Sequence, residues 1–239
     1  MKTIAIIPSF NENPRVLQET INKTKKHVNQ VLVIDDGSKE KVKVKNCKLL
    51  INEQNRGKGA TLIKGFNYAI KNKFEVVITL DADGEHNPEE IPKFLDKINS
   101  FDFVIGQRTY YRTLERRIVN AFANFWFALL IPNIKDMYCG FRVIKINALN
   151  KMQFKGSGFE LEPEMLLEAV KQKVSIGFQE IETKPIEKSN FKFKDYIKTN
   201  ILYDEWIIKN HRFINMNPFK KLFLIHIAYI GKIISKILK

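Results

Sequence analysis

The chain has 239 residues, 44% of them hydrophobic and 28% charged, a composition that allows one sizeable core and excludes a disordered or fibrous protein. Its formal net charge of +14 indicates either a polyanionic partner or a lysine-rich coding bias. The sequence has no zinc-finger spacing and no RNA-binding signature, so no nucleic-acid partner is expected. It also has no uninterrupted apolar run of about 18 residues, so no membrane-spanning helix is predicted.

Over the first hundred residues, short apolar runs alternate with segments of helical period. Strands are predicted at residues 3–7, 31–34, 47–51, 76–80 and 103–106. Helices are predicted at residues 14–27, 57–72 and 88–99. The first and third helices begin with the caps Asn13 and Asn87, each followed by proline. This alternation predicts a mostly parallel α/β sheet flanked by helices.

Beyond residue 108 the pattern changes. Residues 114–131 are predicted to form a helix with a cationic start and a very apolar end, interpreted either as a core helix or as an interfacial helix facing lipid. Residues 158–171 indicate an acidic loop that runs into a helix, and residues 174–185 have the pattern of a strand.

The chain is therefore divided into three parts. Residues 1–186 form the α/β domain, residues 187–217 a Lys-rich loop with a connecting helix, and residues 218–239 an amphipathic helix. That last helix combines a wide apolar face with a rim of lysines, which is typical of a segment lying in an anionic membrane interface. The alternative is a helix that caps the domain or makes an oligomer contact.

Two acidic clusters follow apolar runs that are predicted to be strands. Asp35 and Asp36 follow residues 31–34, and Asp81 and Asp83 follow residues 76–80. Ligands bind at the carboxyl ends of strands in parallel α/β sheets. Four carboxylates at such an edge would repel one another unless a cation or a cationic ligand lies among them. The sequence therefore predicts a metal-dependent nucleotide site.

The order of the polar motifs is more specific than any one of them. They lie at residues 8–12, 35–38, 55–60, 81–89, 106–108, 139–142 and 158–164. This series resembles the family 2 glycosyltransferases of the GT-A fold, and most of all their dolichol-phosphate and polyprenyl-phosphate branch. The resemblance covers roughly residues 3–186 and implies a Rossmann-like, mostly parallel sheet flanked by helices.

The resemblance implies roles for individual residues in donor binding. The residues that it assigns to the nucleotide are Pro8, Phe10, Glu12, Ile34, Asp35, Asp36, Lys58, Asp81 and Ala82. Asp81 and Asp83 correspond to the DxD pair of the family, which holds Mg²⁺ or Mn²⁺ against the diphosphate, and Glu85 falls where a polar residue completes the metal shell.

The resemblance also implies an acceptor site and a set of catalytic residues. Arg108 and Arg116 match positions that bind phosphate, with Arg117 as the alternative to Arg116, and Lys188 substitutes for an arginine of the branch that this chain lacks. The residues expected to be catalytic are Asp83, Arg108, Arg116 and Glu162. Arg142 is expected to support the site, and His86 is interpreted as a helix-start residue rather than a ligand.

Three glutamates, Glu160, Glu162 and Glu164, stand where relatives that glycosylate hydroxyl groups usually carry a Glu-Asp pair. On an extended segment alternate residues share a face, so one of them would be able to act as a base, and Glu162 is the candidate. The alternative is that they interact with the helix N-terminus or with the Lys-rich loop.

The expected activity is transfer of a sugar from a nucleoside-diphosphate sugar to a polyprenyl phosphate, by an inverting, metal-dependent and peripheral enzyme on the cytoplasmic face of the membrane. Cys47 and Cys139, which form no metal-ligand pattern, agree with a reducing compartment. The alternatives are a glycosyltransferase that uses a hydroxyl acceptor, a nucleotidyltransferase, and a non-enzymatic basic module that binds membrane surfaces or nucleic acid.

Overall fold

The computed structural model describes residues 1–108, 124–125, 127–183, 193–214 and 216–237. Within them, seven strands form one sheet in the order β3-β2-β1-β4-β6-β5-β7. These strands are β1 (Thr3–Ser9), β2 (Gln30–Asp35), β3 (Lys48–Ile51), β4 (Val76–Thr79), β5 (Phe103–Arg108), β6 (Arg142–Lys145) and β7 (Ile176–Ile181). Only the pairings of β6 with β4 and β5 are antiparallel among these strands, so the predicted mostly parallel α/β sheet is confirmed.

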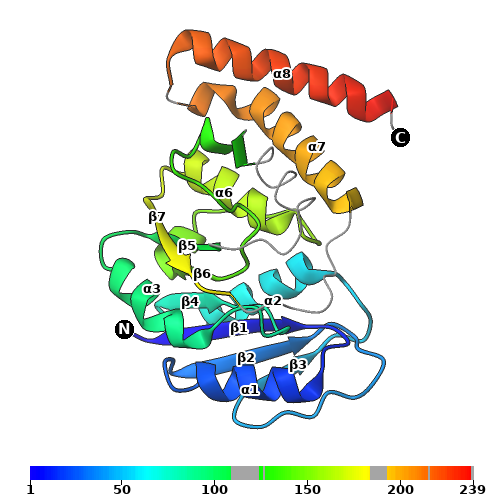
Figure 1. Cartoon of the computed structure of the whole chain (residues 1–239), viewed down its shortest axis with the longest axis vertical. Helices are drawn as coiled ribbons and strands as arrows, with labels where there is room; N and C mark the ends of the chain where they lie inside the picture. The colour runs from blue at the N-terminus through cyan, green and yellow to red at the C-terminus, as the bar shows by residue number, and fades with distance from the viewer. Residues whose placement is uncertain (109–123, 126, 184–192, 215, 238–239) are drawn as a thin grey trace.

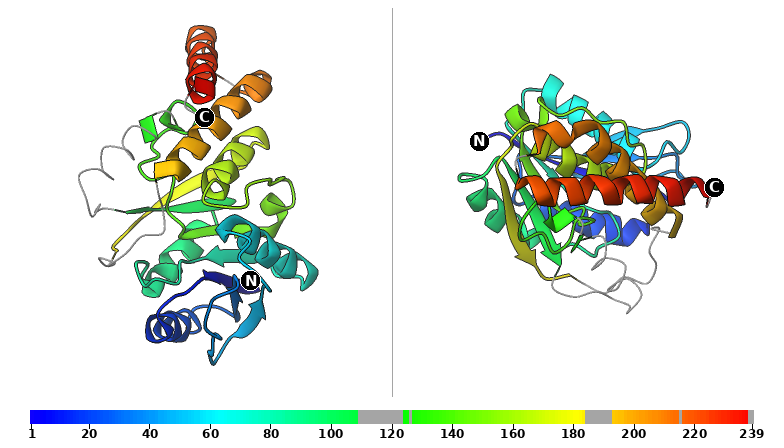
Figure 2. Two further views of the ribbon diagram at one scale, coloured as in Figure 1. Left: turned by 90° about the vertical axis from the view of Figure 1, so that its right-hand side faces the viewer. Right: turned by 90° about the horizontal axis from the view of Figure 1, so that it is seen from above.

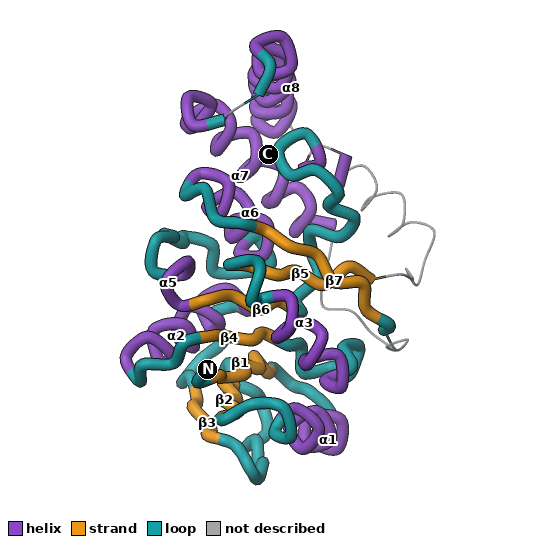
Figure 3. Tube along the Cα trace, turned by 90° about the vertical axis from the view of Figure 1, so that its left-hand side faces the viewer, coloured by secondary structure: helices purple, strands orange, loops and turns teal. Residues whose placement is uncertain are grey.

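Helices lie on both faces of the sheet, with α1 and α3 on one face and α2 and α5 on the other (Figure 3). The described helices are α1 (Pro14–Thr24), α2 (Lys58–Lys71), η1 (Pro88–Glu90), α3 (Ile91–Lys97), α5 (Ile146–Leu149), α6 (Leu161–Lys171), α7 (Phe193–Asn210), η2 (His211–Phe213) and α8 (Pro218–Ile237). The arrangement gives the sheet two buried faces, as a doubly covered parallel sheet requires.

The two faces of the sheet belong to two separate hydrophobic clusters. Ile4 and Ile6 of β1 are buried in a cluster that includes residues of α2, whereas Ala5 and Ile7 are buried in a cluster that includes residues of α1. All four side chains are 0% exposed. Successive side chains of a strand point to opposite faces, so the continuous apolar run of β1 fills both cores.

The predicted helix starts are confirmed, with one change of helix type. The side-chain oxygen of Asn13 accepts a hydrogen bond from the backbone N–H of Arg15, and that of Asn87 accepts one from Glu89. The segment after Asn87 begins as the 3₁₀ turn η1, and the α-helix α3 begins only at Ile91. Pro92 has no N–H, so it fits the first turn of an α-helix and not its interior.

Strand β6 was not predicted from the sequence. Its apolar residues are only Val143 and Ile144, between Arg142 and Lys145, and so short a run has no periodicity that separates strand from turn. Tertiary pairing decides its conformation, because β6 fills the space between β4 and β5.

Helices α7 and α8 lie at the end of the molecule remote from β1, β2 and β3 (Figure 1), and α8 runs across that end (Figure 2). The predicted C-terminal helix is confirmed as α8, and the connecting helix as α7. Leu224 and Ala228 of α8 are each 1% exposed and share a hydrophobic cluster with Trp206 of α7 and with residues of the sheet. The division at residues 186 and 217 stays a prediction.

None of the helices in the described part of the chain combines the length and apolar character that a membrane crossing needs.

Candidate active site

The acidic clusters lie at the same edge of the sheet, on either side of β1. Strand β1 lies between β2 and β4, all three are parallel, and their carboxyl ends therefore meet. The Asp81 carboxylate lies directly over Gly140, where an added Cβ atom would be 2.7 Å from Asp81 Oδ2. The Thr79 hydroxyl donates a 2.6 Å hydrogen bond to the Gly140 carbonyl and fixes this approach.

Asp35 and Asp36 are each 3% exposed, and their carboxylates accept hydrogen bonds from the protein itself. Asp35 accepts from the hydroxyl and backbone N–H of Ser38. Asp36 accepts from the Asn52 amide at 2.8 Å and from the backbone N–H groups of Arg56 and Gly57. Asp36 therefore fixes the turn that precedes α2. The contact of Asp36 with the base or ribose of the donor, and the supporting role of Asp35, stay predictions.

The other residues assigned to the nucleotide line the ends of β1, β2 and β4. Phe10 is 37% exposed, whereas Ile34 is 0% exposed, so a base contact at Ile34 would have to come from its backbone. Burial raises the pKa of Glu12, and the Asp81 charge adds to the increase while Lys58 opposes it. Pro8 pairs with Ile34 in the sheet register. The pKa of Glu12 therefore responds to the charges of the acidic site.

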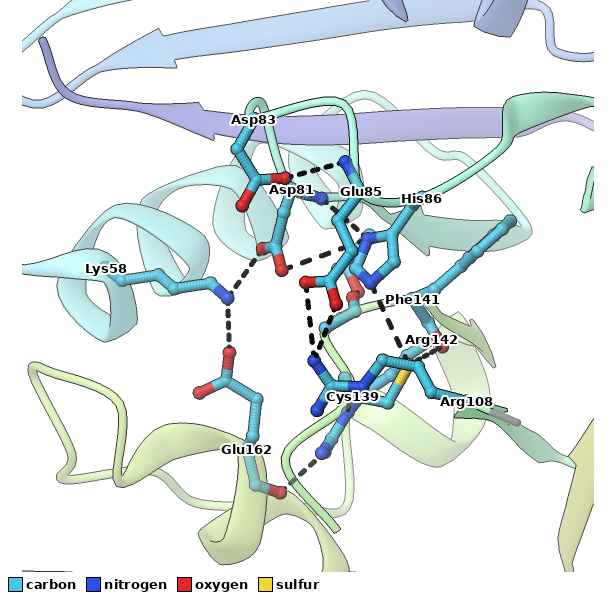
Figure 4. Close-up of polar contacts among 12 residues, drawn as sticks. Lys58, Asp81, Asp83, Glu85, His86, Arg108, Cys139, Phe141, Arg142 and Glu162 are labelled. Atoms are coloured by element: carbon cyan, nitrogen blue, oxygen red, sulfur yellow. Dashed lines mark hydrogen bonds and ion pairs between the residues drawn. The ribbon is translucent and has the colours of Figure 1, made fainter. Parts of the chain in front are cut away.

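Lys58 links the acidic cluster to α6 (Figure 4). Its Nζ atom is 2.6 Å from Asp81 Oδ1 and 2.7 Å from Glu162 Oε1, and only 16% of its side chain is exposed. Burial alone would lower the pKa of Lys58, but the charges of Asp81 and Glu162 raise it above its usual value. Lys58 is therefore a permanent cation in a nearly closed site.

The two aspartates of the DxD pair have opposite pKa shifts. Burial favours the neutral form of Asp81, but the Lys58 ammonium and further positive charge lower the pKa of Asp81 to about 2. Burial and then the Asp81 charge raise the pKa of Asp83 to about 7. Asp83 Oδ1 accepts a 3.0 Å hydrogen bond from the Glu85 backbone N–H, and Ala82 between the pair is buried. The two carboxylates of the pair therefore differ in how readily they ionise.

His86, expected only to lie at a helix start, is buried beside the Asp81 and Asp83 pair. Its Nδ1 accepts a 3.1 Å hydrogen bond from the Asp81 backbone N–H, which places the ring proton on Nε2. Burial lowers the pKa of His86, so the ring is neutral in this position. Nε2 lies 3.9 Å from the Cys139 sulfur, and burial raises the pKa of that thiol to about 12. His86 positions the Asp81 backbone.

Arg108 is held by two acids. Its Nε and Nη2 atoms donate to the two carboxylate oxygens of Asp136 at 2.5 and 3.0 Å, and Nη1 lies 3.3 Å from Glu85 Oε1. Asp136 is 0% exposed. Such a two-point pair fixes the plane of the guanidinium group. Glu85, predicted to be a metal ligand, is therefore paired with the arginine that was predicted to bind the acceptor phosphate.

Asp136 was missed by the sequence reasoning. It is the only acidic residue between Glu115 and Glu160, and it lies just before the Cys-Gly-Phe-Arg motif. A buried acid among apolar residues needs a cationic or hydrogen-bonding partner. The isolated position of Asp136 in the sequence was therefore a signal that it has such a partner.

Arg142 supports the site as expected. Its guanidinium group is 1% exposed and donates to the main-chain carbonyls of Cys139, Glu162 and Met137 at 2.8, 2.5 and 2.6 Å. Arg142 therefore ties the segment beside Gly140 to the first turn of α6.

The expectation of an extended segment at Glu160, Glu162 and Glu164 was wrong. Glu162 and Glu164 lie in the first turn of α6, and Glu160 is its cap residue. Residues four apart share a helix face. Glu160 accepts from the N–H groups of residues 157 and 158, and Glu164 from those of residues 155 and 156. Glu162 points toward Lys58 and pairs with it, as Figure 4 shows.

Within the described residues, no three side chains of His, Cys, Asp or Glu converge to hold a metal ion by themselves. Asp81 and Asp83 nevertheless fit Mg²⁺ or Mn²⁺, because carboxylate oxygens suit hard cations and such ions take their remaining ligands from water and substrate phosphates. Burial and the neighbouring Asp81 charge raise the pKa of Asp83, and a bound cation would offset that repulsion.

Three predicted residues, Arg116, Arg117 and Lys188, lie outside the described residues, as does most of the predicted helix at residues 114–131.

Comparisons with known proteins place the chain in a family. Residues 4–152 match the family described as glycosyl transferase family 2. An uncharacterized protein of Methanocaldococcus jannaschii is 37% identical over 195 residues, covering 72% of this chain and 84% of that protein. The undecaprenyl-phosphate mannosyltransferase of Micrococcus luteus is 26% identical over 185 residues, covering 68% of this chain and 76% of the enzyme.

Among solved structures, glucosyl-3-phosphoglycerate synthase from Mycobacterium tuberculosis, in complex with Mn²⁺, UDP and glucosyl-3-phosphoglycerate, matches with a TM-score of 0.68 and 15% identity. The match covers 87% of this chain and 79% of that chain, and it shows a shared GT-A fold. Together with the family match, these findings establish that the chain belongs to glycosyltransferase family 2 and is related to the transferases that act on polyprenyl and dolichyl phosphates.

Proposed function

We propose that this glycosyltransferase moves one sugar from a nucleoside-diphosphate sugar to a polyprenyl phosphate, dolichyl or undecaprenyl, with inversion at the anomeric carbon. The observation that carries the proposal is the grouping of Asp81, Asp83, Lys58 and Arg108 at one sheet edge. The mannosyltransferase of Micrococcus luteus, whose name states an undecaprenyl-phosphate acceptor, supports this choice of acceptor class.

The donor half of the reaction needs charge stabilisation and no proton transfer. A nucleoside diphosphate gains negative charge as the glycosidic bond breaks, and a bound Mg²⁺ or Mn²⁺ would supply positive charge there. Asp81 and Asp83 are the residues that would hold this ion. Lys58, 2.6 Å from Asp81, is placed to donate a hydrogen bond to a diphosphate oxygen next to it.

The acceptor half suits an anion. A polyprenyl phosphate is already charged at neutral pH, so it needs cationic groups rather than a general base. Arg108 is our candidate among the described residues, because buried Asp136 fixes its guanidinium plane beside the metal site. The roles of Arg116, Arg117 and Lys188 rest on the sequence alone. Attack from the face opposite the leaving diphosphate inverts the anomeric carbon.

Helix α8 supports a peripheral location on the cytoplasmic face of a membrane, where a lipid acceptor would be reached. Five large apolar side chains of α8 are more than half exposed: Phe219, Leu222, Phe223, Tyr229 and Ile230. Lysines accompany them on the same helix. Apolar side chains with a cationic rim match the interface of an anionic bilayer.

A hydroxyl acceptor is the alternative, with Glu162 as base. Glu162 is the one glutamate of its group that points into the site, and this observation keeps the alternative open. Its Oε1 atom is paired with Lys58 at 2.7 Å, and an acid held by a cation is a weaker base. The lipid-phosphate acceptor therefore remains our choice.

The test is a transfer assay in detergent with UDP-, GDP- and dTDP-sugars, Mg²⁺ or Mn²⁺, and a polyprenyl phosphate that is either present or omitted. A lipid-linked sugar that disappears with EDTA and with Asp83→Asn supports the proposal. Donor binding without lipid transfer, together with product from a hydroxyl acceptor, would instead favour the alternative. Absence of binding to every donor would contradict both.

A further inference from the structure

Lys58 is held between two carboxylates that come from different parts of the chain. Its ammonium nitrogen lies 2.6 Å from Asp81 Oδ1 and 2.7 Å from Glu162 Oε1. Asp81 follows β4 and belongs to the proposed metal site, whereas Glu162 lies in the first turn of α6. One cation thus offsets the charges of two acids, only one of which is proposed to hold a metal ion.

Lys58 occupies the carboxylate that a divalent cation would also need. Two cations close to one carboxylate repel each other, and the doubly charged ion is held more strongly. Asp83, the other acid of the pair, accepts a hydrogen bond from the Glu85 backbone and makes no ion pair with Lys58 in the structure. A metal ion at Asp81 would therefore weaken the Lys58–Asp81 pair and leave the Lys58–Glu162 pair intact.

Glu162 is placed to retain Lys58. Its side chain is 3% exposed, and its buried Oε2 atom has no hydrogen-bond partner among the described residues. A buried carboxylate without a cation carries a large desolvation cost, and the Lys58 ammonium offsets that cost for Glu162. Arg142 donates to the Glu162 main-chain carbonyl at 2.5 Å and fixes the start of α6.

The backbone that carries Lys58 is fixed against the same loop. The Ala60 N–H donates a 3.0 Å hydrogen bond to the Ser157 carbonyl. A Cβ atom added at Gly59 would lie 2.7 Å from the carbonyl oxygens of residues 156 and 158. The start of α2 is therefore locked to the segment before α6, and movement is left to the four-carbon side chain of Lys58.

We infer that Lys58 is an exchangeable counter-cation, which neutralises Asp81 when no metal ion is bound and which stays on Glu162 and donates to the donor diphosphate when the ion binds. Glu162 is then a positioning residue that acts through Lys58, not a base that touches the acceptor. This role rests on the donor half of the proposed function, and the acceptor does not enter it.

Binding of Mn²⁺ without nucleotide measures this exchange, by electron paramagnetic resonance of the free ion. Lys58→Met is expected to bind Mn²⁺ about tenfold more tightly than the wild type, because no cation competes for Asp81. Its affinity for UDP or GDP at saturating Mn²⁺ is expected to fall about tenfold, because a charge-assisted hydrogen bond is lost. Lys71→Met, an exposed lysine at the far end of α2, is the matched control and is expected to match the wild type in both measurements.

Two further variants separate the role of Glu162. Glu162→Gln leaves Lys58 to Asp81 alone, so Mn²⁺ binding without nucleotide is expected to weaken about threefold, and the KM for the donor is expected to rise more than kcat falls. The double variant Lys58→Met with Glu162→Met removes the buried acid that Lys58→Met alone would leave without its cation, and it is expected to bind Mn²⁺ more tightly than the wild type. Thermal unfolding of each variant establishes that it is folded.

Three results are decisive. Equal Mn²⁺ affinities of the wild type, Lys58→Met and the double variant would overturn the counter-cation role. A loss of kcat in Glu162→Gln with unchanged Mn²⁺ and nucleotide affinities would overturn the positioning role and make Glu162 a base. A tightened Mn²⁺ site in a protein that binds no nucleotide would support the exchange at Asp81, overturn the diphosphate contact of Lys58 and refute the proposed function.

Discussion

The acidic site and the C-terminal helices α7 and α8 differ in what they bury: the first buries charged side chains, whereas the second exposes large apolar ones. At the acidic site, charged side chains are buried, and Asp81, Glu162 and Arg108 each have a partner within 3.3 Å. On α8, large apolar side chains are exposed, with Phe219 83% accessible. A buried charge requires a fixed partner, whereas an exposed apolar side chain leaves its partner open. The first region therefore suits small charged ligands, whereas the second leaves apolar side chains accessible, which we propose to contact a membrane surface.

The largest effect is expected where the charge of Asp81, which we propose to hold a metal ion, is removed from the acidic site. Asp81→Asn keeps the shape but removes the charge that pairs with Lys58, so transfer is expected to fall by about 10²–10³-fold. Sugar transfer and Mn²⁺-dependent nucleotide binding measure it. Asp96→Asn on α3 is the control, since Asp96 is exposed and remote from the site. Equal losses in both variants would contradict the role of Asp81.

Next in size is the cost of removing the buried cation that ties the site together. Arg142→Met leaves the carbonyls of Cys139, Glu162 and Met137 without their donor, and the free energy of unfolding is expected to fall by about 3–5 kcal/mol. Urea denaturation measures this loss. Arg212→Met, at an exposed position in η2, is expected to change it by less than about 0.5 kcal/mol. A small effect at Arg142 would mean that the loop reorganises.

The two faces of α8 give a contrast within one helix. Phe219→Ser with Phe223→Ser is expected to weaken binding to phosphatidylglycerol-containing vesicles by about tenfold per residue, with stability unchanged. Leu224→Ala, on the buried face, is expected to lower the free energy of unfolding by about 2–4 kcal/mol. Vesicle co-sedimentation and denaturation measure the two effects. Vesicle binding that survives loss of both phenylalanines would remove α8 as the membrane contact.

The smallest effect concerns the contact between α7 and α8. Burial, and then the charge of Glu205, raise the pKa of Asp204 to about 7. An acid whose pKa is higher in the folded than in the unfolded protein lowers the free energy of unfolding as it ionises. For Asp204 this loss of stability is absent below about pH 4 and complete above about pH 7. Because Asp204 is partly exposed, the effect is expected to stay below about 1 kcal/mol. Unfolding of the wild type and Asp204→Asn at pH 5 and pH 8 measures it, and parallel curves would contradict the shift.

Local patterns made much of the fold predictable. Asn13 and Asn87 are caps in the structure, because a side-chain acceptor before proline satisfies a free helix N–H in any context. The placement of Asp36 and Asp81 at one sheet edge was also predictable, since parallel strands deliver their carboxyl ends to one edge. The glutamates from Glu160 to Glu164 were misassigned, because three residues have no measurable period and the packing of α6 decides which face each one takes.

The sequence by itself determined the parallel α/β domain, its helix starts, the acid pairs at the strand ends and the amphipathic character of the last helix, because these depend on neighbours along the chain. Only the tertiary structure decided that Lys58 joins Asp81 to Glu162, that Asp136 holds Arg108, and that β6 runs antiparallel. These features join residues from distant segments, and folding alone brings such side chains within a few ångströms of one another.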